Sequence, residues 1–62
     1  MELTNREKEV IGYLCEGLSD REIAAKMFVT VSAVKFHIHN SLAKLNLKNR
    51  TQLALLFKEL KK

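Results

Sequence analysis

Four side chains between residues 32 and 39 have the types and the spacing that a DNA-reading surface needs. They are a serine, a lysine, an aromatic residue and a histidine: Ser32, Lys35, Phe36 and His39. At about 100° per residue, a helix places all four within about 100° of one another, on one face. Lysine and histidine can donate to base edges or phosphates, and an aromatic ring can contact a thymine methyl group. The pattern predicts a face that contacts the major groove of DNA.

The opposite side of the same segment predicts how that face is held. Four aliphatic residues and a serine gather there: Val34, Ile38, Ser41, Leu42 and Leu45. This stripe is expected to pack on the core and to leave Phe36 pointing outward, a costly position for a ring that nothing covers. A neighbouring helix or another molecule could cover the ring in place of DNA, and that alternative stays open at this point.

Helix-start signals divide the chain into four segments, and nothing reads as a strand. Three capping residues stand three positions before Glu or Gln, as in a capping box: Thr4 with Glu7, Ser19 with Glu22, and Asn49 with Gln52. Thr30 caps a further segment without the box, because Ala33 occupies the place of the acid. We expect helices at about residues 5–16, 20–27, 31–45 and 50–60, which is an all-α four-helix bundle.

The second and third of these segments are separated by Phe28, Val29 and Thr30 alone, which is the spacing of a helix-turn-helix. Such turns often use glycine where the chain needs a positive φ, and this one has none. Either Phe28 adopts the left-handed conformation or the turn is of another type. Gly17 is well placed to end the first helix in that conformation.

Composition limits the other classes of protein that the chain could be. With 62 residues and one cysteine, Cys15, it predicts a single domain over residues 1–62 with no intramolecular disulfide. No apolar run is long enough to span a bilayer, so a soluble, cytoplasmic protein is expected. The net charge is −2 over residues 1–30 and +6 over residues 31–62, which suits a polyanionic partner. A merely solvated basic face is the alternative.

The remaining polar residues do not form a convincing catalytic or metal site. His37 and His39 lie about 200° apart on a helix, so they cannot chelate one ion together. His37 borders both faces and is expected to pack or to bond the backbone, with contact to a phosphate as the alternative. Arg6, Glu7 and Glu9 are expected to cap the first helix and to tie it to its neighbours, with each exposed pair worth only tenths of a kcal/mol. We therefore expect no enzymatic activity, metal or cofactor.

Short motifs along nearly the whole chain resemble one family of regulators. They are Leu3-Thr4-Asn5-Arg6-Glu7, Glu9-Val10, Glu22-Ile23-Ala24, Val34-Lys35-Phe36-His37 and Lys44-Leu45. This pattern resembles the signature of LuxR-type (GerE-like) helix-turn-helix domains, the C-terminal effector domains of LuxR and NarL/FixJ regulators. Two positions depart from it, since Ala33 stands where the family commonly has threonine and Ser41 where it has an aliphatic residue.

The resemblance implies a role for particular residues and elements. The segment 31–45 would enter the major groove, with Ser32, Lys35, Phe36 and His39 as base-reading positions. Contacts to the DNA backbone would come from three further residues: Thr30, Lys44 and Arg50. The segment 50–60 would form a dimer.

The last segment itself predicts two faces. Four apolar residues should face the core: Leu53, Leu56, Phe57 and Leu60. Leu55 lies on the other side with Thr51, Ala54 and Lys58, and has no obvious partner within the domain. We expect a weak symmetric homodimer through this second face. An isolated exposed leucine is the alternative.

Together these patterns predict sequence-specific binding of double-stranded DNA at promoters by a transcriptional regulator. RNA polymerase and an N-terminal receiver or sensor domain are possible further partners. Two other classes stay open. One is a protein-interaction module that docks a receiver domain or RNA polymerase through Phe36 and Leu55. The other is a nonspecific nucleic-acid or membrane-surface binder that uses only the basic half.

Overall fold

The computed structural model describes residues 2–60, except for the side chain of Leu60, and all its regular elements are helices. These are α1 (Asn5–Cys15), α2 (Asp20–Met27), α3 (Val31–Leu45) and α4 (Arg50–Leu60). No strand occurs within residues 2–60. The predicted all-α four-helix fold is confirmed, and α1 ends one residue earlier than expected.

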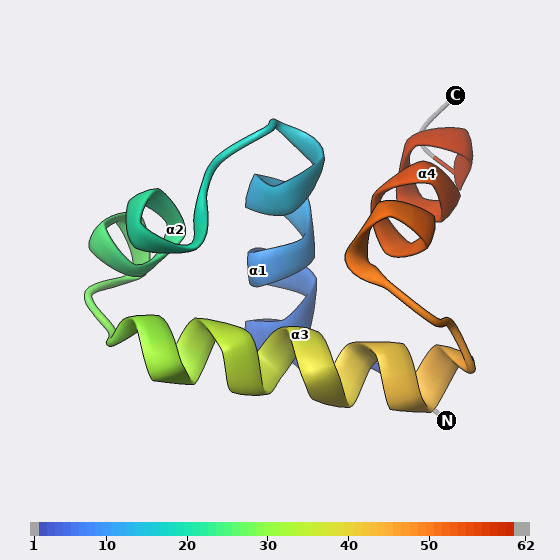
Figure 1. Cartoon of the computed structure of the whole chain (residues 1–62), viewed down its shortest axis with the longest axis horizontal. Helices are drawn as coiled ribbons and strands as arrows, with labels where there is room; N and C mark the ends of the chain where they lie inside the picture. The colour runs from blue at the N-terminus through green and yellow to red at the C-terminus, as the bar shows by residue number, and fades with distance from the viewer. Residues whose placement is uncertain (1, 61–62) are drawn as a thin grey trace.

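The helices are arranged around α1 and α3. In Figure 1, α3 runs along the bottom of the molecule, α1 stands across it from behind, and α2 and α4 lie on opposite sides of α1. Every helix contributes to one buried apolar cluster: Val10, Ile11, Ile23, Ala24, Met27, Val34, Ile38 and Leu53. Because α1, α2 and α4 all lie on one side of α3, its other side is left to solvent.

Local capping explains where the helices begin. The Thr4 hydroxyl accepts from the Glu7 N–H while the Glu7 carboxylate accepts from the Thr4 N–H, and Ser19 forms the same box with Glu22. Thr30 caps α3 by accepting from the Ala33 N–H at 3.1 Å, without a reciprocal acid, as expected.

The third predicted capping box is only half correct. The Asn49 side chain accepts from the Gln52 N–H at 2.9 Å, which caps α4. The side-chain oxygen of Gln52, Oε1, however, accepts from the backbone N–H of Lys48 at 2.8 Å instead of from that of Asn49. The glutamine therefore bonds the turn before α4, one residue earlier than a capping box requires.

Phe28 resolves the question about the corner between α2 and α3. It ends α2 with φ 57° and ψ 43°, in the left-handed region, and its side chain is 96% exposed. That conformation costs an L-residue about 1–2 kcal/mol. Gly17 has φ 88°, as expected, and Asn46 ends α3 with φ 56°. The tight corner thus exists without glycine.

Two smaller features complete the description. Cys15 is half-buried at the junction of α1 and α4, where its thiol donates to the Ala54 carbonyl with a sulfur–oxygen distance of 3.6 Å. Within residues 2–60, no helix is both long enough and apolar enough to cross a lipid bilayer.

Candidate nucleic-acid interface

The solvent side of α3 carries the four side chains that the sequence placed on one face. Ser32, Lys35, Phe36 and His39 are all exposed, while Val34, Ile38 and Ser41 are buried on the reverse of the helix. The predicted separation of the two faces is therefore confirmed. The arrangement presents hydroxyl, ammonium and imidazole groups to one partner surface from a helix braced along its other side.

Phe36 is the largest apolar group on this face. Its side chain is 61% exposed, so no neighbouring helix covers the ring. The His37 imidazole meets it edge-on, with ring centroids 5.8 Å apart and planes at 65°. His37 itself is only half-exposed, as expected for a residue at the border of the two faces. The aromatic pair gives the middle of α3 an apolar surface between polar groups.

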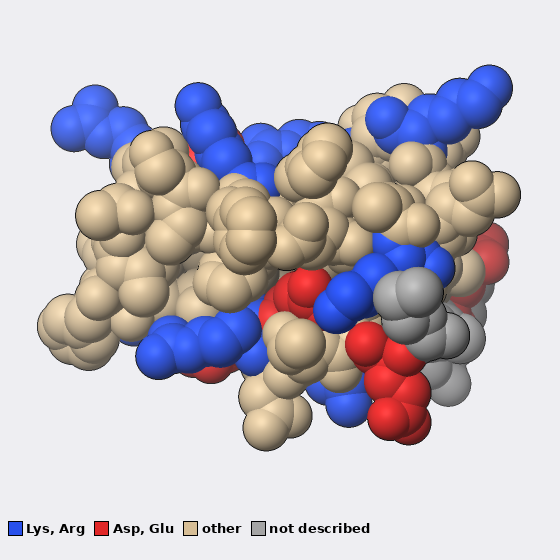
Figure 2. Space-filling model, turned by 90° about the horizontal axis from the view of Figure 1, so that it is seen from below, with Lys and Arg blue, Asp and Glu red and all other residues tan. Residues whose placement is uncertain are grey.

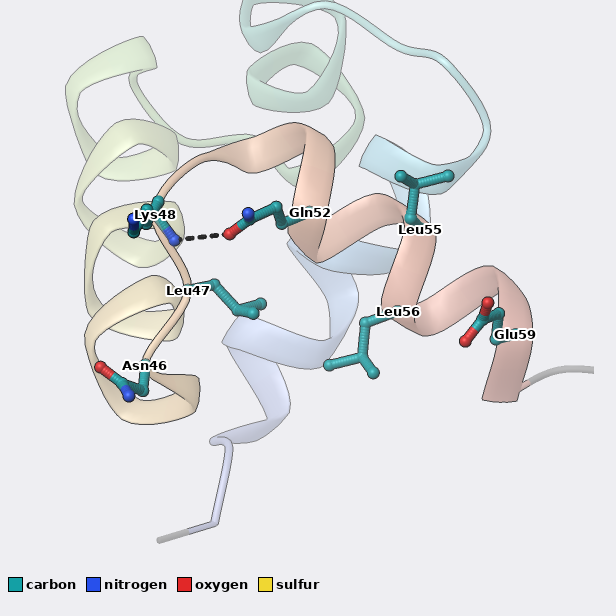
Figure 3. A pocket seen from close by; sticks show the side chains of 7 residues that line it. All are labelled: Asn46, Leu47, Lys48, Gln52, Leu55, Leu56 and Glu59. Carbon is teal, nitrogen blue, oxygen red and sulfur yellow. Dashed lines mark hydrogen bonds between the residues drawn. The ribbon is translucent and has the colours of Figure 1, made fainter.

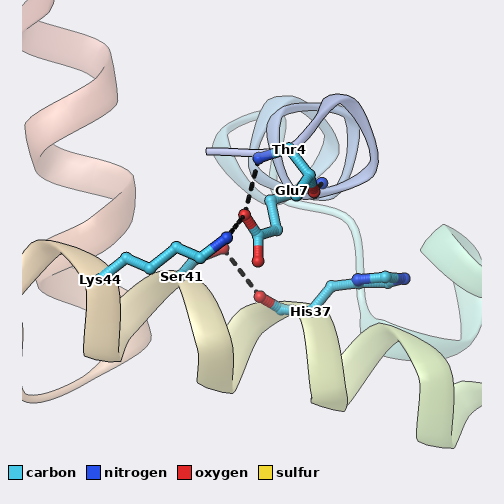
Figure 4. Close-up of polar contacts among 5 residues, drawn as sticks. All are labelled: Thr4, Glu7, His37, Ser41 and Lys44. Carbon is cyan, nitrogen blue, oxygen red and sulfur yellow. Dashed lines mark hydrogen bonds and ion pairs between the residues drawn. The ribbon is translucent and has the colours of Figure 1, made fainter. Parts of the chain in front are cut away.

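Ser41 shows why a hydroxyl is tolerated on the buried side of α3. Its Oγ donates to the carbonyl of His37, one turn earlier, at 2.7 Å (Figure 4). A buried hydroxyl is costly only when it lacks a partner, and this bond supplies one within the helix. The departure from an aliphatic residue is thus compatible with the packing of α3 on α1.

Glu7 agrees only in part with the sequence-based expectation. It is 2% exposed instead of lying on the surface, and its Oε1 accepts from the Lys44 ammonium at 2.7 Å and from the Thr4 N–H at 2.8 Å (Figure 4). The hydrogen bond from Lys44, together with that from Thr4, holds the pKa of this carboxyl below its usual value, against the opposing effect of burial. Glu7 thus caps α1 and ties it to α3, as expected, but its carboxylate is buried and does not belong to an exposed pair.

The same contact decides the position of Lys44, for which the family resemblance implies a contact to the DNA backbone. Its ammonium lies against α1, in a largely enclosed ion pair. Lys44 is therefore not part of the exposed group of side chains at residues 32–39. The pair links α1 to α3.

Arg50 is also engaged within the molecule. Its Nη2 lies 2.5 Å from Oδ1 of Asp20, so the first residue of α4 is tied to the first residue of α2. The Arg50 side chain stays 43% exposed, against 18% for Asp20. Thr30, the remaining predicted backbone contact, is exposed at the start of α3.

The α3 side of the molecule is neither uniformly basic nor uniformly apolar. Figure 2 shows it from below, with uncharged side chains over much of the middle and basic side chains along the upper edge, at the lower left and to the right of the centre. Acidic side chains show in the lower part of the view. The upper part of this surface combines uncharged side chains with basic ones at its edge, which fits a groove bounded by phosphates.

The outer face of α4 carries the residues predicted for self-association. Leu55 is 58% exposed, Thr51 and Lys58 are exposed, and Ala54 is half-buried. Figure 3 shows Leu55 at the edge of a shallow hollow between the α3–α4 turn and α4. The hollow is lined by Asn46, Leu47, Lys48, Gln52, Leu55, Leu56 and Glu59.

Of the predicted core face of α4, Leu53 is buried and Leu56 and Phe57 are half-buried, whereas the side chain of Leu60 lies outside the described residues.

Sequence reasoning missed two acids, Glu7 and Asp20, as partners of the predicted contact residues Lys44 and Arg50. No sequence signal pairs them, since they lie 37 and 30 positions from Lys44 and Arg50. Within residues 2–60, no three His, Cys, Asp or Glu side chains gather where they could hold a metal ion.

Comparisons with known proteins agree with this geometry. A family model described as "Bacterial regulatory proteins, luxR family" matches residues 1–57. The Bacillus subtilis protein YhcZ, an uncharacterized transcriptional regulatory protein, is 48% identical over 54 residues, which is 87% of this chain and 25% of YhcZ. The DNA-binding transcriptional activator DevR/DosR of Mycobacterium tuberculosis is 42% identical over 60 residues, covering 97% of this chain and 28% of that protein.

The fold also matches a solved structure of a regulator. The response regulator ChrA of a heme-sensing two-component system superposes with a TM-score of 0.87 at 34% identity, over 98% of this chain and 30% of ChrA. The chain thus spans about a quarter of the length of the curated relatives it matches. With four helices in this arrangement and a match over nearly its full length, the chain belongs to the luxR family of bacterial regulatory proteins.

Proposed function

We propose that the chain is a single DNA-binding domain, residues 1–62, that binds double-stranded DNA sequence-specifically and regulates transcription at promoters. One observation carries this proposal: α3 exposes Ser32, Lys35, Phe36 and His39 together while its reverse is packed on the core. A rigid helix that projects polar and apolar groups of this kind has what is needed to read base edges in a major groove. Membership of a family of bacterial regulators supports it.

The contacts divide into base-reading and positioning contacts. Lys35 and His39 donate to base edges, Phe36 contacts a thymine methyl or a sugar, and Ser32 bonds either kind of group. Thr30 contacts a phosphate at the start of α3. Lys44 and Arg50 contribute to phosphate binding only through donors outside their ion pairs, because each already uses one donor on an acid.

The domain acts as a weak symmetric dimer in this proposal. The outer face of α4, with Thr51, Ala54, Leu55 and Lys58, meets its own copy and sets two α3 helices about one DNA turn apart. The exposure of Leu55 beside a hollow that Leu47 and Leu56 also line supports this surface over an isolated leucine. Replacing Leu55 with Glu should weaken binding to a duplex with two half-sites far more than to a single half-site. Equal losses on both would exclude the dimer.

The proposal includes partners beyond this DNA-binding domain. Relatives of this chain are about four times as long, and the ChrA structure is that of a response regulator, so a receiver or sensor domain on the same polypeptide is proposed as a partner. RNA polymerase is a second partner. The protein is proposed to be cytoplasmic, without enzymatic activity and without a cofactor.

Selection of bound duplexes from a random pool tests the proposal directly. An enriched inverted repeat is expected, and binding to it should weaken steeply as salt increases. A steep salt dependence without sequence enrichment would instead indicate a backbone or surface binder. The absence of both would point to a protein-docking module.

A matched pair of lysine variants makes the test specific to α3. Lys35→Ala should weaken binding to the selected duplex by about 1–3 kcal/mol if it removes a base contact. Lys8→Ala removes the same charge from an exposed lysine on α1 instead of α3 and should cost much less. Equal losses for the two variants would contradict base reading by α3.

A further inference from the structure

We propose that Asp20 is a positioning residue for DNA binding: it holds the guanidinium of Arg50 by one edge and leaves the other edge oriented for a backbone phosphate. This inference rests on the proposed function, because it assumes a DNA ligand. It concerns Asp20, an acidic residue that a simple charge argument would expect to oppose DNA binding.

The contact between the two side chains is one-sided. Among the described residues, Arg50 has a single side-chain hydrogen bond, from Nη2 to Oδ1 of Asp20 at 2.5 Å. A guanidinium carries five N–H donors in a planar fork, so most of them lie outside this contact. The Arg50 side chain is 43% exposed and the Asp20 side chain 18%, so the arginine is the more open to solvent of the two. The geometry leaves room for a second acceptor.

The location of Arg50 indicates that it does not serve the stability of its own helix. It is the first residue of α4, where the positive end of the helix dipole disfavours a cation. Asp20 is the first residue of α2, where a carboxylate is favoured. The carboxylate therefore offsets the unfavourable placement of the cation, and the same helix end that disfavours a cation attracts a phosphate.

Holding the arginine before DNA arrives should strengthen its contact with a phosphate. A free arginine side chain loses rotamer freedom when it binds, and one already held by an acid loses less. A planar guanidinium fixed on one edge also presents the other edge in the parallel geometry that phosphate oxygens accept.

Two interpretations of Asp20 predict opposite changes in DNA affinity when its carboxylate is removed. If Asp20 only adds negative charge, its removal should tighten DNA binding, because one repulsive charge is lost. If Asp20 positions Arg50, its removal should weaken binding although the protein becomes more positive. The sign of the change is therefore the decisive observation.

The experiment measures the affinity of Asp20→Ala for the duplex that the wild-type domain selects. A loss of about threefold to tenfold is expected, a typical coupling between two groups that act together. Asp20→Glu keeps a carboxylate and should recover most of the affinity. Glu16→Ala removes an exposed acid at the end of α1 and should leave binding unchanged or slightly tighter. Thermal unfolding of each variant confirms that it is folded, and Asp20→Asn replaces Asp20→Ala if the latter does not fold.

A double substitution separates positioning from a general effect on the fold. In the Arg50→Ala background, Asp20→Ala should cause no further loss of DNA affinity, because the side chain it orients is gone. Tighter or unchanged binding by Asp20→Ala, or an equal loss in both backgrounds, would overturn the inference while leaving the proposed function standing. A wild-type domain without any sequence preference would overturn the proposed function itself, and this inference with it.

Discussion

The two long sides of α3 belong to the same fifteen residues, yet one is packed in the core and the other is exposed to solvent. On one side Val34, Ile38 and Ser41 are buried, and Lys44 is paired with Glu7 of α1. On the other, Phe36 and Lys35 are exposed to solvent. Burial of apolar groups stabilises the fold from the first side, whereas the second side contributes little to stability. Folding and ligand contact are thus separated on a single helix, and substitutions should affect one or the other.

The largest expected loss of stability comes from a substitution on the buried side of α3. Ile38→Ala should lower the free energy of unfolding by about 2–5 kcal/mol, because it removes apolar burial and leaves a cavity against α1. Urea or thermal denaturation measures it. Phe36→Ala removes a larger side chain from the exposed side of the same helix and should change stability by no more than about 0.5 kcal/mol. Similar losses for the two variants would show that the sides are not separated.

The Glu7–Lys44 pair tests whether the buried side also depends on charge. Glu7→Gln should lower the free energy of unfolding by about 1–3 kcal/mol, since it weakens a buried acceptor that Lys44 and Thr4 both use. Glu9→Gln, an exposed neighbour on α1, is the matched control and should be nearly neutral. The comparison fails if both variants unfold at the same denaturant concentration.

The pH dependence of stability should follow the same carboxyl. The pKa of Glu7 is lowered from its ordinary value of 4.5 by the hydrogen bonds from Lys44 and Thr4, so its charged form is favoured in the folded state. Its contribution is therefore fully present above the unfolded pKa and is lost as the pH falls through the lower folded pKa.

Denaturation at several pH values should show that the free energy of unfolding falls more steeply with decreasing pH for the wild-type domain than for Glu7→Gln. The exposed Glu22, whose pKa is lowered by its hydrogen bonds with Ser19, titrates in both proteins and cancels in the difference. Parallel acid profiles for the two proteins would mean that Glu7 does not carry the effect.

The smallest expected effect lies at the start of α3, where both sides of the helix begin. Thr30→Ala removes the hydroxyl that accepts from the Ala33 N–H and should cost about 1 kcal/mol of stability. Thr30→Ser keeps an acceptor and should retain most of it. If Thr30 also contacts a phosphate, the alanine variant loses DNA affinity beyond what its stability explains, measured well below its unfolding temperature.

The candidate site was largely predictable where its determinants are local. The positions of Ser32, Lys35, Phe36 and His39 on one face follow from helical periodicity alone, and solvent exposure of that face agrees. The burial of Glu7 could not be predicted, since its capping-box position is compatible with either an exposed or a buried carboxylate. Only the packing of α3 across α1 decides between them.

What the sequence determined by itself is the set of four helices, their starting residues and the two faces of α3, because capping and periodicity act between residues at most a few positions apart. The tertiary structure alone decided the pairing of Lys44 with Glu7 and of Arg50 with Asp20, and the use of left-handed Phe28 at the corner. Those features depend on how whole helices are placed against one another. An ion pair between residues 30 or more positions apart exists only when packing brings its two helices together.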